Sequence, residues 1–199
     1  MTKQLSEEQL KNNVDQFWKY IIIMSKERRL QLKKMFDEAP SILETYFTAP
    51  ASSREEFHNC FPGGLLDHSL NVTRNLKRLA DTLCPHKYTD DVLAFVGLFH
   101  DFGKIGDGSF EYYIPNESDW HRKKGMLYET NKDCVQMPTS ERGLFVLQNH
   151  GVLLTSEEYL AIRLNDGQYD ETNKFYKMKE PELALLVHWA DMWSTFSEK

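Results

Sequence analysis

The sequence predicts an all-α protein. Apolar residues recur at helical spacing in most segments, as they do in residues 14–22. Few segments show the period-two alternation of strands, although residues 112–114 and 175–178 could form a small hairpin. Hydrophobic residues make up 41% and aromatic residues 13% of the 199-residue chain, which is enough for a packed core. We therefore expect a helical bundle.

The N-terminal part of this bundle is expected to be an extension. Residues 6–38 have the pattern of one or two amphipathic helices, and Ser6 resembles an N-terminal cap. A short helix should lie between Pro40 and Pro50, which punctuate the chain. We expect residues 1–50 to pack as a helical extension on a functional domain formed by residues 51–199.

The functional domain is expected to combine long helices with one irregular segment. A helix over residues 65–83 follows a Pro-Gly-Gly break, and a second should run from the Thr89 cap to about Phe102, with Gly103 as its C-terminal cap. Residues 104–138 are irregular, with weak helical character at 119–129, and a connection of this length is usually functional. We expect a substrate-facing flap here. Three more helices are expected at 139–149, 155–164 and 181–196.

Charge and cysteine usage limit the class of protein. The net charge of −6 argues against a broad basic surface for nucleic acid. The three cysteines form no CxxC pair, which indicates reduced thiols. The first residues lack the apolar stretch of a signal peptide, and no apolar run approaches the ~18 residues that cross a bilayer. We expect a cytoplasmic protein without membrane attachment.

Three segments carry candidate metal ligands. His100 and Asp101 end a strongly apolar helix, and imidazole with carboxylate suits a borderline divalent cation. An isolated His-Asp pair is more often a capping histidine beside a solvated acid. However, His68 opens another apolar helix, and Asp191 lies within a third, where a buried carboxylate requires a partner. A cation shared by these residues would provide that partner.

The order His68, His100-Asp101, Asp191 resembles the H…HD…D pattern of the HD-domain superfamily of metal-dependent phosphohydrolases. The wordings Gly-Gly-Leu-Leu-Asp-His-Ser-Leu and His-Asp-Phe-Gly-Lys are similar to those of stand-alone HD hydrolases and HD-type exonucleases. The resemblance covers roughly residues 57–196. It implies a helical fold and a divalent ion (Mn, Fe, Co, Ni, Zn or Mg) bound by the four residues.

The resemblance also implies roles in catalysis. Asp101 would orient the attacking water, and Lys104 would lie near the substrate phosphate. Many HD nucleotidases carry a glutamate where Lys104 stands, which separates this chain from that branch. Several HD subfamilies bind a second ion through two more histidines, and His121 and His150 are the histidines in the corresponding interval. The centre could therefore hold one ion or two.

Several of these residues have alternative interpretations. His121 could bind metal, donate a proton or lie on a solvated surface, and His150 has the setting of an ordinary helix exit. His188, one turn before Asp191, could support the site or belong to the core. The turn at 165–170 could contact a ribose or base, or lie at the surface. The candidates for substrate binding are Lys104, Arg122, Lys123 and His58.

We expect a metal-dependent phosphohydrolase that cleaves a phosphate ester or phosphodiester of a small nucleotide. The acidic net charge favours a small phosphorylated molecule over stable nucleic-acid binding. Alternatives within the class are an HD-type 3′–5′ exonuclease and a cyclic-nucleotide phosphodiesterase. An alternative of another class is a non-catalytic HD module that binds a nucleotide. Residues 6–38 could in addition mediate assembly into a homo-oligomer.

Overall fold

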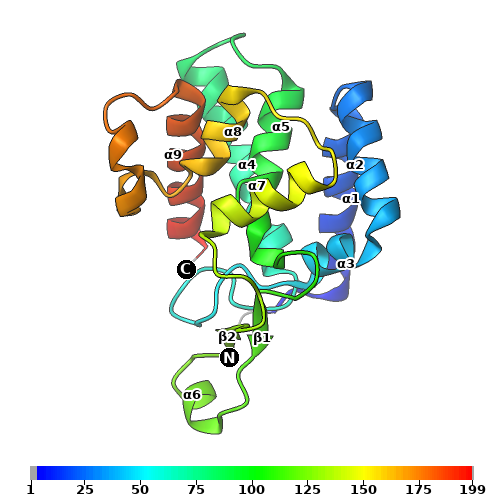
Figure 1. Cartoon of the computed structure of the whole chain (residues 1–199), viewed down its shortest axis with the longest axis vertical. Coiled ribbons are helices and arrows are strands. Elements are labelled where there is room, and N and C mark those ends of the chain that lie inside the picture. The colour runs from blue at the N-terminus through cyan, green and yellow to red at the C-terminus, as the bar shows by residue number, and fades with distance from the viewer. Residues whose placement is uncertain (1–3, 199) are drawn as a thin grey trace.

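The computed structural model describes residues 4–198, and it is helical apart from one two-stranded sheet (Figure 1). The all-α prediction is thereby confirmed. In chain order the elements are α1 (Glu7–Ile23), α2 (Lys26–Glu38), α3 (Pro40–Thr48), α4 (Gly64–Leu83), α5 (Asp90–Phe99), η1 (Phe102–Ile105), β1 (Tyr113–Pro115), α6 (Asp119–Lys123), β2 (Tyr128–Thr130), α7 (Thr139–Asn149), α8 (Ser156–Arg163), η2 (Gly167–Tyr169), η3 (Glu171–Tyr176) and α9 (Glu182–Ser197).

The N-terminal helices share the core of the rest of the chain. Ser6 begins α1 with a reciprocal capping box, and Ser25 caps α2. Phe17 of α1 is fully buried and packs edge-on against Tyr46 of α3. Both α1 and α3 contact α4. The division at residue 50 stays a prediction, as does assembly through α1 and α2.

Helix α4 is the centre of the bundle, because it packs against both α5 and α9. Its buried face is long, running from Leu65 to Ala80, and one turn of this face carries His68. The expected Thr89 cap of α5 is present, since its side chain accepts from the Val92 amide. The N-terminal end of α4 and the C-terminal ends of α5 and α9 lie on one side of the molecule, near the hairpin β1–β2 (Figure 1).

Helix α5 ends at Phe99, earlier than predicted, and Gly103 does not cap it. Gly103 instead lies in the 3₁₀ turn η1, pressed against α7. A Cβ atom at this position would lie 1.9 Å from the Thr139 carbonyl oxygen and 2.7 Å from the Gly143 nitrogen. The glycine is therefore required by close backbone approach, and the turn after His100 is fixed against α7.

The segment between η1 and α7 contains more structure than predicted. Strands β1 and β2 pair antiparallel, with Tyr113 opposite Thr130. The strand expected near residues 112–114 is present, but residues 175–178 are not its partner; they lie at the end of η3 and in the turn that follows. Helix α6 projects beyond the sheet, away from the bundle (Figure 1).

Arg142 of α7 fixes the base of this segment. Its buried guanidinium donates to the carbonyl oxygens of Met137 at 2.9 Å, Gly103 at 3.2 Å and Val135 at 3.3 Å. It also lies 4.1 Å from the centre of the Tyr112 ring. The two ends of the segment are thus held to η1 by one side chain.

Among the described residues, no helix is long and apolar enough to cross a membrane. Cys60, Cys84 and Cys134 are free thiols, as their spacing predicted.

Candidate metal centre

Three helices place imidazole and carboxylate groups at one point. His68 lies in the second turn of α4, which begins after Gly63 with its left-handed φ of 79°. His100 caps the C-terminus of α5, and Asp101 is the next residue. Asp191 projects from α9 toward them. His68 and His100 are fully buried, and the side chains of Asp101 and Asp191 are 8% and 18% exposed.

The distances between the four side chains suit a shared cation. His68 Nε2 lies 3.0 Å from Asp191 Oδ1 and 3.6 Å from Asp101 Oδ2. His100 Nε2 lies 3.5 Å from Asp101 Oδ2 and 3.8 Å from Asp191 Oδ1. Ligand atoms about 2.0–2.2 Å from one ion are separated by distances of this order. Neither Nε2 atom has a hydrogen-bond partner among the described residues.

The remaining nitrogen of each histidine fixes the ring. His100 Nδ1 lies 2.8 Å from the Gly97 carbonyl oxygen, which can only accept a hydrogen bond. His68 Nδ1 lies 2.8 Å from Glu198 Oε2. Both Nδ1 atoms therefore act as donors, and both Nε2 atoms face the carboxylates, where a proton or a metal ion can lie between them. Metal-binding histidines are oriented by the same kind of partner, so these residues fit a divalent cation.

The electrostatics of the site favour a cation. Burial alone would lower the pKa of His68, but the carboxylates of Asp191 and Glu198 outweigh it and raise that pKa to about 10. Burial alone would raise the pKa of Asp191, but His100 and His68 hold it well below its ordinary value. The site thus stabilises positive charge strongly in its interior.

Lys104 supplies one cation from the protein itself. Its Nζ lies 2.6 Å from Asp101 Oδ2, at the end of the η1 turn. Burial would lower the pKa of Lys104, but the charge of Asp101 raises it above its ordinary value. The lysine therefore stays protonated beside the carboxylate, as the expected phosphate-binding role requires.

His58, a candidate for substrate binding, lies next to His68. Its ring centre is 4.4 Å from that of His68, and its Nε2 is buried without a partner in the described chain. Burial, followed by the charge of Lys104, lowers the pKa of His58 to about 2. The imidazole is neutral at any ordinary pH.

The structure does not bring His121 and His150 to this centre. His121 lies on α6, on the projecting part of the hairpin segment (Figure 1), with its ring against Trp120. His150 caps the C-terminus of α7, whereas the N-terminal part of that helix packs on η1. Neither residue belongs to the His/Asp groups found among the described residues. The second-metal histidines were chosen by sequence order, which does not determine distance in space.

Arg122 and Lys123 lie on α6 with His121, away from the centre. Arg122 is occupied locally, since it donates to the Asn116 carbonyl at 2.5 Å and pairs with Asp119. The part of the flap next to the centre is instead β1. Tyr113 of this strand lies near Lys104. Burial raises the pKa of Tyr113, and the ammonium charge of Lys104 opposes that rise.

Sequence reasoning missed Glu198. It is the C-terminal cap of α9 and stands seven residues after Asp191, and this spacing was the available signal. Asp166 belongs to the turn at 165–170, for which contact with a ribose or base and a surface position were the two alternatives; lost hydration and then the charges of Asp101 and Asp191 raise its pKa. Its neighbour Asn165 is buried and donates to the His100 carbonyl at 3.4 Å, which ties this turn to the metal residues.

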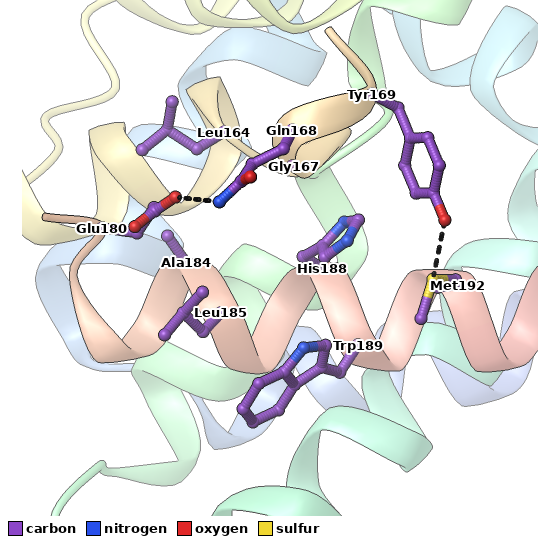
Figure 2. A pocket seen from close by; sticks show the side chains of 10 residues that line it. All are labelled: Leu164, Gly167, Gln168, Tyr169, Glu180, Ala184, Leu185, His188, Trp189 and Met192. Atoms are coloured by element: carbon purple, nitrogen blue, oxygen red, sulfur yellow. Dashed lines mark hydrogen bonds between the residues drawn. The ribbon is translucent and has the colours of Figure 1, made fainter. Parts of the chain in front are cut away.

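A pocket of about 370 Å³ lies on the other side of this turn, between η2 and α9 (Figure 2). Tyr169, His188 and Trp189 contribute rings to its walls, and Gln168 donates to Glu180 at one end. His188 Nδ1 lies 2.7 Å from the Asn165 carbonyl oxygen. His188 belongs to neither His/Asp group found among the described residues; it joins the pocket to the turn that also contacts the metal residues.

Replacing Glu198 by glutamine should weaken metal binding without removing it. The amide can still meet His68 Nδ1, but it lacks the charge that increases the basicity of the ring. Changes to such outer partners reduce metal affinity roughly 10- to 100-fold. Titration of the apoprotein against a chelating dye measures this. Glu157→Gln, at the exposed start of α8, is the control and should bind as the wild type does.

Comparison with known proteins identifies the family. A family model, HD domain, matches residues 65–194, which include α5 and most of α4 and α9. Searches of curated proteins and of solved structures returned no match to the chain. The family match covers more than half of the sequence and includes His68, His100, Asp101 and Asp191. The chain therefore belongs to the HD-domain family, whose members form a superfamily of metal-dependent phosphohydrolases.

Proposed function

We propose that this protein is a metal-dependent phosphohydrolase whose metal ligands are His68, His100, Asp101 and Asp191. The observation that carries the proposal is the convergence of two buried, unpartnered Nε2 atoms on two carboxylates. The fixed Nδ1 partners of both rings support it. Leaving such nitrogens without a partner costs about 1–3 kcal/mol each, which a bound cation would recover.

The residues around the ion have distinct roles in this proposal. A divalent ion bound here supplies a Lewis acid for a phosphoryl oxygen and lowers the pKa of a water molecule. Lys104 offers its ammonium group to a phosphate oxygen, since it is held at the site by Asp101. Asp101 has a second carboxylate oxygen with which to orient water. Glu198 holds the His68 ring in one orientation.

The proposed substrate is a small nucleotide. The pocket of Figure 2 supports this, because its ring side chains offer stacking surfaces for a planar base. Gln168 and Glu180 add an amide and a carboxylate at its edge. His188 and Asp191 are one helical turn apart on α9, about 4.5 Å along its axis. The pocket therefore lies about one helical turn from Asp191, and the proposal assigns the base to this pocket and the phosphate to the metal residues.

Hydrolysis of nucleotides compared with glycerol phosphate tests substrate and pocket together. Tyr169→Ala should raise KM for the nucleotide roughly 5- to 150-fold, the equivalent of about 1–3 kcal/mol of stacking. It should leave KM for glycerol phosphate unchanged, since that ester has no ring. Tyr159→Ala, on α8 outside the pocket, is the control. An equal change for both substrates would show that Tyr169 does not contact a base.

The same assay separates the alternatives. Metal-loaded protein should be given mononucleotides, cyclic nucleotides and short oligonucleotides. Release of phosphate from mononucleotides supports the proposal. Cleavage confined to cyclic nucleotides or to oligonucleotide 3′ ends would replace it with the phosphodiesterase or the exonuclease. Binding of a nucleotide without any turnover would indicate the non-catalytic module.

A further inference from the structure

His58 is a half-buried histidine with a buried Nε2 atom, and the H…HD…D pattern assigns it no function. It lies in the loop between α3 and α4, and its Nε2 atom has no hydrogen-bond partner among residues 4–198. One ligand atom each from His58, His68 and Asp101 lie within 4.8 Å of one another. An isolated buried nitrogen of this kind requires an explanation, and an ion is one of the few available.

Contacts with the helical bundle fix one side of the loop that carries His58. Ser52 Oγ donates to the His58 carbonyl at 2.7 Å. The next residue, Asn59, is buried at a φ of 45° and donates to Asp67 Oδ2 at 3.1 Å. Asp67 Oδ1 in turn accepts from Asn13 of α1 at 2.9 Å. A non-glycine residue in this region of φ is strained, and strain of this kind persists where surrounding contacts fix it.

The hairpin segment holds the loop from the other side. The Glu55 amide donates to the Gly125 carbonyl at 2.8 Å, and the Tyr128 amide donates to the Ser53 carbonyl at 3.1 Å. Arg54 and Met126 form an isolated antiparallel bridge. The loop is therefore clamped between the bundle and the hairpin, and His58 has little freedom to find another partner.

We propose that His58 is a fifth protein ligand, beside Asp101, of a single divalent ion at this centre. Its buried Nε2 atom has no hydrogen-bond partner among the described residues, and an imidazole nitrogen that is free in this way can bind metal. Three histidines then contribute nitrogen, and the two aspartates contribute oxygen. The proposal depends on the metal centre but not on the hydrolytic activity.

The charges at the centre favour one ion over two. Once a bound ion has replaced the proton on His68, Asp101, Asp191 and Glu198 carry three negative charges, and Lys104 carries one positive charge. The remaining two negative charges are those that one divalent ion neutralises. A second cation beside Asp101 would meet the Lys104 ammonium, which already lies 2.6 Å from that carboxylate.

The number of ligands also bears on the identity of the metal. Catalytic zinc sites have three protein ligands, and structural zinc sites have four. Five nitrogen and oxygen donors instead suit ions of higher coordination number, such as Mn, Fe or Co.

The test counts imidazole ligands directly. Pulsed EPR of the wild-type protein loaded with Mn(II) should show three coordinated imidazoles, and elemental analysis should show one ion per chain. His58→Gln should show two imidazoles and bind the ion at least about 10-fold more weakly, the lower limit for outer-partner changes. His121→Gln and His150→Gln are matched controls and should retain three imidazoles with wild-type affinity.

Two imidazoles in the wild type, or an unchanged count in His58→Gln, would overturn the proposal. So would two ions per chain. The wild-type measurement decides the question even if His58→Gln does not fold. Three imidazoles without any turnover would leave His58 as a ligand and remove the proposed hydrolase function. Turnover with only two imidazoles would do the reverse.

Discussion

Asp191→Asn is expected to lose both the bound metal and all metal-dependent hydrolysis. Asp191 Oδ1 is the carboxylate oxygen that faces the Nε2 atoms of both His68 and His100, at 3.0 and 3.8 Å. The amide has nearly the same shape but no negative charge. Changing an outer partner reduces affinity roughly 10- to 100-fold, so removing this ligand should exceed the upper limit. Elemental analysis and phosphate release measure the two losses.

The fold should survive this substitution. Asparagine removes the charge of a largely buried carboxylate and, with it, the cost of desolvating that charge. Circular dichroism should therefore match the wild type. Asp37→Asn, at an exposed position on α2, serves as the control and should retain metal and activity. Full metal content in Asp191→Asn would mean that the ion is bound elsewhere.

Gly103→Ala should produce a large loss of stability. The added Cβ would lie 1.9 Å from the Thr139 carbonyl oxygen and 2.7 Å from the Gly143 nitrogen, and both are backbone atoms. The methyl group can be accommodated only if α7 moves away from η1. Overpacking costs about 1–3 kcal/mol, and backbone contacts place this case at the upper end. For a chain of this length, about 3 kcal/mol lowers Tm by roughly 6–12 °C.

Gly151→Ala is the matched control for that experiment. A Cβ at Gly151 meets nothing within 4 Å, so only its φ of 74° opposes alanine. The left-handed conformation costs alanine about 1–2 kcal/mol. Thermal unfolding of both variants therefore compares the loss of Tm from a steric clash at residue 103 with the loss from an unfavourable backbone conformation at residue 151. Equal destabilisation of the two would contradict the close contact between η1 and α7.

The helices were predictable because their determinants are local. The Ser6 and Thr89 caps and the periodic apolar residues lie within the segments that they organise. The order of His68, His100-Asp101 and Asp191 was informative for a related reason: each of these residues lies on such a helix or directly after its end. The HD-domain match confirms the resemblance that this order indicated.

The rest of the centre depends on tertiary contacts that no local pattern reports. His58 reaches the site through a loop whose shape depends on Asp67 and, through Asp67, on Asn13, which is distant in sequence. His121 has the more suggestive sequence position, between the HD pair and Asp191. The pairing of β1 with β2 nevertheless carries it outward with α6. Spacing along the chain could not distinguish these two histidines.

Arg142 fixes the base of the hairpin segment but not the α6 end. The two ends should therefore differ in how well they tolerate substitution. Arg142 donates hydrogen bonds both to this base and to η1. A substitution at the base should therefore also shift Asp101 and Lys104. The α6 end has no buried residue and projects from the bundle (Figure 1). Residues 119–123 are consequently the natural attachment point for a fluorescent or spin label, one that reports on the protein without disturbing the chemistry at its centre.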